Sequence, residues 1–143
     1  MQIEQVTEAT EEIFEAFQRL VPQLTSNSPA PTREDLQTLA ESESSLLFTA
    51  RGEDGRIAGS ACVTVYRVPT GVRAIIEDVI VDEDSRGQGI GEALVQRALE
   101  AARERGAPAV TLTSNPKREA ANRLYVKMGF IRRETNAYLY KFG

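Results

Sequence analysis

The chain has 143 residues, of which 41% are hydrophobic, and this length and composition are typical of one soluble domain. Its 17 basic and 21 acidic side chains leave a net charge of −4. Because proteins that bind nucleic acids usually need a basic surface, this balance argues against a nucleic-acid partner. An acidic surface mildly favours positively charged amine substrates.

Two residue types that carry much enzyme chemistry are scarce. The chain has no histidine, which excludes histidine metal sites, Ser-His triads and the commonest general base. The single cysteine, Cys62, leaves no internal disulfide and no cysteine-based metal site, and its apolar surroundings predict a small buried hydrophobe. We therefore expect no metal, and proton transfer must use a carboxylate, a tyrosine or water.

Residues 1–5 are polar and lack the basic and apolar leader of an exported protein. No apolar run approaches the length that spans a bilayer, so we expect no membrane partner. These features predict a cytoplasmic protein.

The first half of the chain predicts two helices followed by strands. Residues 9–24 place apolar side chains on one helical face, and Thr32 is a suitable N-cap for a short helix that ends near residue 41. Residues 45–51 and 56–68 are rich in β-branched and apolar residues, and the turn between them contains two glycines. This pattern predicts a β-hairpin.

The second half predicts alternating strands and helices. A third strand is expected over residues 72–81, where apolar residues are almost continuous, and an amphipathic helix over residues 90–105. Residues 109–113 are predicted to form a strand parallel to the third one, because a helix connects the two. A last helix over residues 118–128 and one or two closing strands within residues 130–142 complete the expectation.

A glycine loop, Arg86-Gly87-Gln88-Gly89-Ile90-Gly91, stands between the third strand and the amphipathic helix. Glycines let several backbone N–H groups point at one place, and the start of a helix adds a partial positive charge. The order of strand, glycine loop and helix therefore predicts a binding site for phosphate groups. The loop lacks the lysine and hydroxyl of a P-loop, and its position and spacing disfavour a dinucleotide fold.

The loop and two other segments resemble the GNAT superfamily of N-acetyltransferases. The R-x-x-G-x-G order of the loop is similar to the acetyl-CoA signature of that superfamily. Residues 121–130, A-N-R-L-Y-V-K-M-G-F, resemble its A-x-x-L-Y-x-x-x-G-F segment, and Ile76-Glu77-Asp78 resembles its I-E-D strand entry. Three motifs in the same order over residues 74–130 are more specific than the glycine loop alone.

The resemblance implies a single N-acetyltransferase domain over residues 1–143, of the α/β class. Such a GNAT-type domain has a central mixed, mostly antiparallel twisted sheet of six to seven strands, flanked by about four helices, with two splayed parallel strands in the middle. The resemblance also implies an enzyme that moves the acetyl group of acetyl-CoA, its cosubstrate, to a primary amine by direct attack. Neither a metal nor a covalent enzyme intermediate is needed.

The resemblance also assigns residues to acetyl-CoA. Val79, Ile80 and Val81 would pair through their backbones with the pantetheine amides, an N–H near Val79 would polarise the thioester carbonyl, and the loop would hold the pyrophosphate. Asn115 is a candidate contact or else a turn residue. Asn122 is a candidate contact or else an ordinary helix residue. The expected cofactor-binding residues are Val79, Ile80, Val81, Arg86, Gly87, Gln88, Gly89, Ile90, Gly91, Glu92, Asn115 and Asn122.

Three residues are candidates for proton transfer. Glu77 and Asp78 are consecutive in a strand, so they face opposite sides of the sheet unless a bulge intervenes. A protonated amine cannot attack a carbonyl, and the resemblance implies Glu77 as the general base, with Asp78 as the alternative. It implies that Tyr125 donates a proton to the coenzyme sulfur as the thiolate leaves. In the structural alternative for Glu77 and Asp78, one carboxylate is exposed and the other pairs with an arginine. In the structural alternative for Tyr125, the residue belongs to the core and its hydroxyl group lies at the rim of the core.

The sequence leaves other functions open. One is a non-catalytic module that binds or senses acyl-CoA, and another is an interaction or nucleotide-binding protein. The acceptor is an amine-bearing small molecule or a peptide, and Arg33 and Arg67 can engage a carboxylate or phosphate on it. Arg118 stands where the superfamily commonly has an asparagine, which puts one cofactor contact in doubt. The sequence shows no clear interface stripe, so a homodimer is left open.

Overall fold

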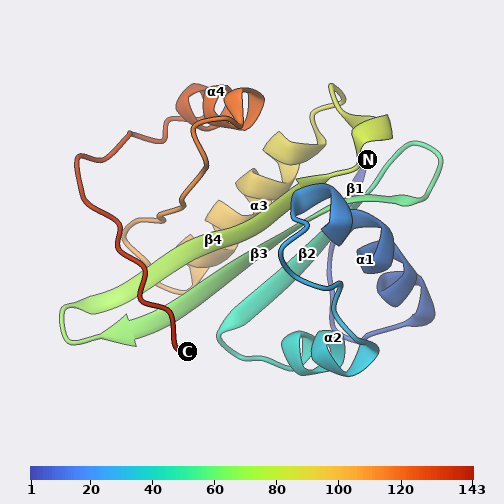
Figure 1. The fold of residues 1–143 in the computed structure, drawn as a ribbon, viewed down its shortest axis with the longest axis horizontal. Coiled ribbons are helices and arrows are strands. Elements are labelled where there is room, and N and C mark those ends of the chain that lie inside the picture. Colours follow the sequence, from blue (N-terminus) through green and yellow to red (C-terminus); the bar gives the residue numbers. More distant parts are fainter. The chain divides into compact units, whose positions relative to one another are not determined.

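An antiparallel sheet forms the centre of the larger part of the chain (Figure 1). The computed structural model describes residues 1–143, and their internal contacts divide them into two units, Met1–Thr113 and Ser114–Gly143. The first unit contains the whole sheet and the helices α1 to α3. The second unit contains the helix α4 and the C-terminal residues.

The sheet has four strands in the order β1-β2-β3-β4, and each strand is antiparallel to its neighbours. The strands are β1 Gln2–Gln5, β2 Ser45–Arg51, β3 Ile57–Val68 and β4 Gly71–Val81. The three strands predicted in residues 45–81 are confirmed to within one residue at each end. We did not predict β1, because its sequence is polar and only its ladder with β2 defines it as a strand.

The four predicted helices are confirmed. They are α1 Glu11–Leu24, α2 Arg33–Ala40, α3 Ile90–Glu104 and α4 Glu119–Lys127, and a short 3-10 helix, η1 Glu83–Ser85, follows β4. None of the helices combines the length and the apolar character that crossing a bilayer requires.

The predicted N-cap of α2 is also present. Thr32 accepts a hydrogen bond from the Asp35 N–H at 3.0 Å, and Asp35 accepts one from the Thr32 N–H at 3.0 Å. This reciprocal pair satisfies two backbone donors that a helix start otherwise leaves without partners. It explains why a segment of only eight residues is helical here.

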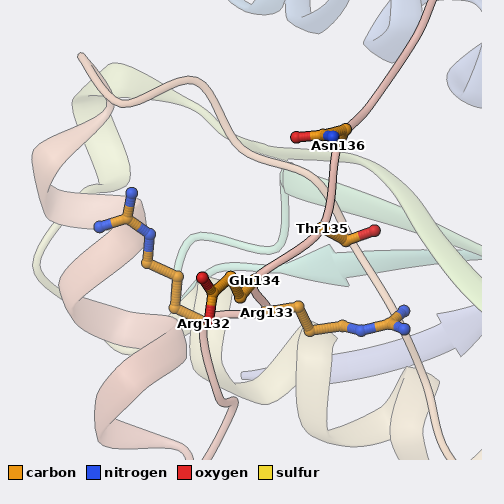
Figure 2. A pocket seen from close by; sticks show the side chains of 5 residues that line it. All are labelled: Arg132, Arg133, Glu134, Thr135 and Asn136. Carbon is orange, nitrogen blue, oxygen red and sulfur yellow. The ribbon is translucent and has the colours of Figure 1, made fainter.

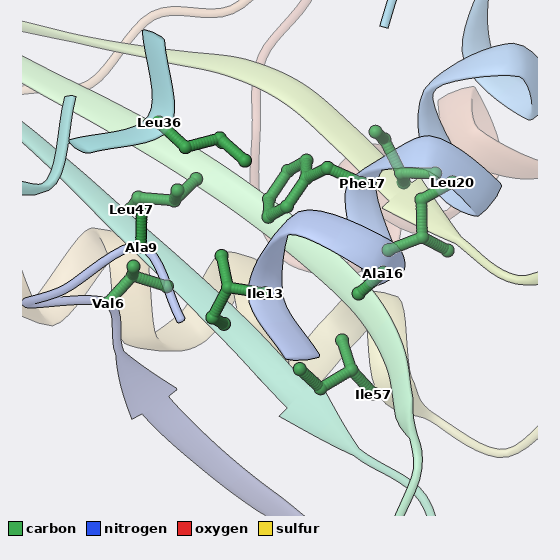
Figure 3. Packing of buried hydrophobic residues seen from close by; sticks show 10 residues of the cluster. Val6, Ala9, Ile13, Ala16, Phe17, Leu20, Leu36, Leu47 and Ile57 are labelled. Carbon is green, nitrogen blue, oxygen red and sulfur yellow. The ribbon is translucent and has the colours of Figure 1, made fainter. Parts of the chain in front are cut away.

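The helices α1 and α2 cover one face of the sheet, and α3 covers the other. Leu47 of β2 belongs to a buried apolar cluster with Phe17 of α1 and Leu36 of α2 (Figure 3). Phe48, the next residue of β2, lies under the guanidinium of Arg97 from α3, with 4.8 Å between the Arg97 Cζ and the ring centroid. Because neighbouring strand residues point to opposite faces, the two sets of helices lie on opposite sides.

The sheet is smaller than we predicted. It has four strands, so the expectation of six to seven strands is wrong, and so is the expectation of two splayed parallel strands. Residues 109–113 form no strand and join β4 at a single parallel bridge between Ile75 and Thr111. At this bridge the Ile76 N–H donates to the Thr111 carbonyl at 2.9 Å, and the Thr111 N–H donates to the Ala74 carbonyl at 3.0 Å.

The missing ladder has a local explanation. After the bridge, β4 contains a bulge at Asp78 and Val79, which disrupts regular pairing beyond Ile76. Residues 130–142 form no strand either, so the one or two closing strands expected there are wrong.

Gly59 of β3 allows α3 to pack closely on the sheet. A Cβ at Gly59 would lie 2.8 Å from the Ile80 carbonyl oxygen and 3.0 Å from side-chain atoms of Ile90 and Leu94. The carbonyl belongs to the neighbouring strand and cannot move aside without breaking the ladder. Gly59 therefore fixes how closely the first turn of α3 approaches β3 and β4.

Replacing Gly59 with alanine is expected to destabilise the fold by about 1–3 kcal/mol, the usual cost of an overpacked core. Urea denaturation measures this free energy of unfolding. Gly52→Ala is the matched control, because its added Cβ would meet atoms only at 3.5 and 3.7 Å, which are ordinary contacts. Equal losses of stability in the two variants would contradict the explanation.

Candidate active site

The glycine loop lies exposed between η1 and α3 in the first unit. Residues 86–89 are all exposed, and Gly87 and Gly89 have φ angles of +82° and +80°, in the left-handed region. A Cβ added to either glycine would meet no atom within 4 Å. Backbone conformation, not packing, therefore requires glycine at both positions. The same open space lets a ligand approach the backbone closely.

The loop leads directly into α3. Gly89 is the N-cap residue and supplies no side-chain hydrogen bond to the helix. The N–H groups of a first helical turn have no partner within the helix, and an anion can accept hydrogen bonds from them. This geometry fits a pyrophosphate, so the structure suits the phosphate site expected from the sequence. The assignment of Arg86, Gly87, Gln88, Gly89, Ile90, Gly91 and Glu92 to acetyl-CoA stays a prediction.

A β-bulge occurs beside the two acidic residues of β4. Between two successive register pairs, β3 contributes one residue, Ala61, whereas β4 contributes two, Asp78 and Val79. Asp78 has a φ of +50°, and it is the only residue other than glycine with a positive φ. Aspartate tolerates this conformation better than most residues. Glu77 and Asp78 are both exposed, and the bulge removes the strict alternation that would have placed them on opposite faces.

Cys62 pairs directly with Glu77 across the ladder between β3 and β4. Burial raises the pKa of the Cys62 thiol to about 11, and the negative charges of Asp78 and Glu77 act in the same direction. The thiol is therefore neutral and a poor nucleophile at physiological pH. It is half-buried and packs against the apolar cluster, so its surroundings are those of a structural cysteine.

Asp82 follows β4 and is a buried charged residue that sequence reasoning missed. The residue is 7% exposed, and its side chain forms an ion pair with Arg19 of α1, with 3.2 Å between the Arg19 Nε and the Asp82 Oδ2. Burial by itself raises the pKa of Asp82, but hydrogen bonds from the Asp84 N–H and from Arg19 outweigh it and hold the pKa below its usual value. The carboxyl group is therefore ionised at neutral pH.

The second unit holds Tyr125 at the end of α4. The Phe130 N–H donates to the Tyr125 carbonyl at 2.9 Å, and the Gly129 N–H donates to the Val126 carbonyl at 3.1 Å. With Gly129 at a φ of +102°, these bonds form a Schellman motif. The rings of Tyr125 and Phe130 meet edge to face with 5.7 Å between their centroids. The glycine and phenylalanine of the motif thus hold the tyrosine in place.

Tyr125 is 6% exposed. Burial raises the pKa of its phenol, and the positive charge of Arg118 offsets part of this shift. The hydroxyl group therefore stays protonated at neutral pH and remains able to donate a hydrogen bond or a proton. Its proposed catalytic role is a prediction that rests on the family motif.

The two asparagines have hydrogen bonds within the second unit. The Asn115 Oδ1 accepts from the Lys117 N–H at 2.9 Å, and the Asn122 Nδ2 donates to the Asn115 carbonyl at 3.0 Å. These bonds shape the turn that leads into α4, which is the structural alternative named for Asn115. Arg118 is the N-cap residue of α4 and makes no side-chain capping bond. Contacts of Asn115 and Asn122 with a cofactor stay predictions.

The candidate residues are divided between the two units. Glu77, Asp78 and the glycine loop belong to the first unit, whereas Tyr125 and the two asparagines belong to the second. A separate hollow in the second unit is lined by residues 132–136 and contains none of the candidates (Figure 2). The side chains of Arg132 and Arg133 point away from each other there, so they do not converge on one ligand.

Comparisons with known proteins show which family the chain belongs to. The acetyltransferase (GNAT) family model matches residues 7–130, which include the strands β2 to β4, the glycine loop and α4. The chain belongs to the acetyltransferase (GNAT) family and is an N-acetyltransferase. Enzymes of this family use acetyl-CoA as the cosubstrate.

Similar proteins include enzymes with different acceptors. Glucosamine 6-phosphate N-acetyltransferase 1 of Oryza sativa subsp. japonica is 33% identical over 138 residues, which are 90% of this chain and 81% of that protein. An acetyltransferase structure from Agrobacterium tumefaciens str. C58, described as putative, superposes with a TM-score of 0.83 at 20% identity, covering 99% of this chain and 100% of the other. The structure of an aminoglycoside acetyltransferase from an uncultured soil metagenomic sample, in complex with sisomicin, superposes with a TM-score of 0.82 at 23% identity. The superposition covers 99% of this chain and 95% of the other. These two structural likenesses show the fold.

Proposed function

We propose that the chain transfers the acetyl group of acetyl-CoA directly to the primary amine of an amino sugar. The observation that carries the acetyl-CoA part is the loop with two left-handed glycines at the start of α3. The acceptor class is supported by the relative named for glucosamine 6-phosphate, which is similar over 90% of this chain. Because the family match spans residues of both units, we propose that residues 1–143 form one domain.

The cosubstrate is proposed to lie along the part of the outer edge of β4 that follows the bridge to Thr111, and to end at the loop. β4 is the last strand of the sheet, and its other edge carries the ladder with β3. A sheet edge offers backbone donors and acceptors to an extended ligand, as amides of a pantetheine arm require. Val79, Ile80 and Val81 would pair with that arm, and the loop backbone would bind the pyrophosphate.

The acidic residues of β4 are proposed to deprotonate the amine. Glu77 pairs with Cys62, whose side chain packs on the cluster formed with α1 and α2, so Glu77 faces the same side of the sheet. We propose that Glu77 accepts the proton of the acceptor ammonium, directly or through water, and that Asp78 is the alternative base. Tyr125 would then donate its proton to the departing sulfur.

One arginine is already engaged on the acceptor side. Arg33 donates to the Ala9 carbonyl at 3.0 Å and to Glu11 at 3.1 Å. Its bonds connect α2 to the start of α1, which favours a structural role. Arg67 at the end of β3 is exposed and remains the proposed contact for an anionic group on the acceptor.

An acetylation screen tests the acceptor. CoA release is measured with glucosamine 6-phosphate, glucosamine, an aminoglycoside, a peptide with a free N-terminus and a lysine peptide. We expect release with the sugars and little with the peptides. Release with the peptides alone would overturn the amino-sugar acceptor, and binding of acetyl-CoA without release for any amine would overturn the catalytic role.

Substitution of the loop glycine tests the cosubstrate site. Gly89→Ala is expected to weaken acetyl-CoA binding about tenfold, a change of about 1.4 kcal/mol, because alanine disfavours a φ of +80° and its methyl group projects into the proposed phosphate site. Isothermal titration calorimetry measures the dissociation constant.

A matched control separates backbone strain from loss of the site. Gly55 lies in the turn between β2 and β3, has a φ of +82°, and is equally open around its Cβ position. Gly55→Ala therefore carries a similar conformational cost, and we expect it to leave acetyl-CoA binding unchanged. If both variants bind as tightly as the original protein, the loop does not hold the cosubstrate.

A further inference from the structure

A partly buried ion pair connects α1 to the segment that enters the glycine loop. Arg19 of α1 donates through its Nε to the Asp82 Oδ2 at 3.2 Å, and its Nη2 donates to the Ile57 carbonyl. Asp82 is 7% exposed, and its own N–H donates to the Ala58 carbonyl at 2.8 Å. One guanidinium thus joins a helix, the first residue of β3 and the residue that follows β4.

A second side chain of α1 extends this connection by one residue. The Gln23 Oε1 accepts a hydrogen bond from the Glu83 N–H at 2.9 Å, and the Gln23 Nε2 donates to the Arg19 carbonyl at 3.3 Å. Asp82 also caps η1, because its Oδ1 accepts from the Asp84 N–H at 3.2 Å. The residues that lead into the loop are therefore held by three side chains, whereas residues 86–89 themselves are exposed.

The other end of the loop is fixed by packing. Ile90, the first residue of α3, lies against Gly59 of β3 and is 2% exposed. The loop therefore spans from the Asp82 ion pair at its entry to the Ile90 contact at its exit. Backbone donors that bind an anion work best when their geometry is fixed before the ligand arrives.

We propose that Arg19, Gln23 and Asp82 are positioning residues for acetyl-CoA, which hold the entry of the glycine loop so that its N–H groups face the pyrophosphate. This inference rests on the proposed cosubstrate site. The Arg19 side chain is 32% exposed, and a partly exposed ion pair contributes little to stability. Its place at the loop entry therefore points to geometry, and the expected effects fall on binding of acetyl-CoA.

The test uses two mild substitutions. Asp82→Asn keeps the shape of the side chain but removes its charge, and Gln23→Met keeps the volume but removes the acceptor for the Glu83 N–H. We expect Asp82→Asn to raise the dissociation constant and the KM for acetyl-CoA about tenfold, as the loss of a charged hydrogen bond would. Gln23→Met should raise the dissociation constant and the KM about threefold to fivefold, as the loss of a neutral hydrogen bond would. The kcat at saturating acetyl-CoA should stay within about twofold in both variants, because neither residue is proposed to touch the reacting atoms.

Arg51→Met is the matched control. Arg51 is also an arginine with ion pairs to α1 and β1, at 2.6 Å to Glu12 and 2.7 Å to Glu4, and its exposure of 27% is close to the 32% of Arg19. It has no bond to the loop entry. We expect its loss to leave the dissociation constant for acetyl-CoA unchanged.

A second readout does not depend on the cosubstrate. Hydrogen exchange of the free protein should become faster for the amides of residues 83–89 in both test variants, with the interior of α3 unchanged. Unchanged exchange at the loop, or lower stability with unchanged acetyl-CoA binding, would overturn the positioning role. If the original protein binds no acetyl-CoA, the proposed function fails, and the exchange data alone decide whether these residues position the loop.

Discussion

Replacing Tyr125 with phenylalanine is expected to lower kcat by about 10²-fold or more, the usual contribution of a positioned general acid. The substitution removes only the hydroxyl group, so the edge-to-face contact with Phe130 and the Schellman motif remain. The KM for acetyl-CoA should change little. The measurement is CoA release at saturating concentrations of both substrates.

Tyr138→Phe serves as the control, because Tyr138 is 90% exposed and has no proposed role. The two variants lose the same atom from different surroundings. A kcat for Tyr125→Phe within about twofold of the original value would remove Tyr125 from the mechanism. Because burial raises the pKa of Tyr125, any loss of rate from its ionisation should appear above the ordinary tyrosine value of about 10.

The second large effect is expected for Glu77→Gln. Glutamine keeps the size of the side chain but cannot accept the ammonium proton, so kcat/KM at neutral pH should fall by about 10²-fold. The difference should shrink as the pH rises toward the pKa of the acceptor amine, because more of the amine is then already deprotonated. The pH profile of CoA release measures both effects.

Asp78→Asn identifies which acidic residue is the base. We expect it to reduce the rate much less than Glu77→Gln. Asparagine tolerates the left-handed conformation of this position about as well as aspartate, so the bulge should persist. A larger loss for Asp78→Asn than for Glu77→Gln would exchange the two roles.

The elements that could be predicted from the sequence are those defined by local patterns. The loop and α3 follow from three glycines and a helical apolar spacing, and the capping pair of Thr32 and Asp35 marks α2. The segments at residues 109–113 and 130–142 have strand-like composition, but a strand exists only when a neighbouring edge pairs with it. Composition does not report whether that edge is available.

The candidate site shows the same limit. The residues of the family motifs stand close together in the sequence, so their pattern is visible there. Arg19 and Asp82 are separated by 63 residues, and no spacing rule connects them. A signal was available, because Arg19 stands between the apolar residues Phe17 and Leu20 of an amphipathic helix, and an aspartate directly follows a buried strand. Charged residues placed beside apolar surfaces in this way indicate a partner across the core.

The bulge in β4 also shifts the phase of the side-chain alternation along the strand. Glu77 and Ile80 are three residues apart, an odd number, so a regular strand would direct them to opposite faces. With one extra residue between their register pairs, Glu77 and Ile80 both face the side of α1, and so does Asp82 two residues further on. A strand without this phase shift would turn Asp82 away from Arg19. One inserted residue thus gives the proposed base and the loop entry the same orientation.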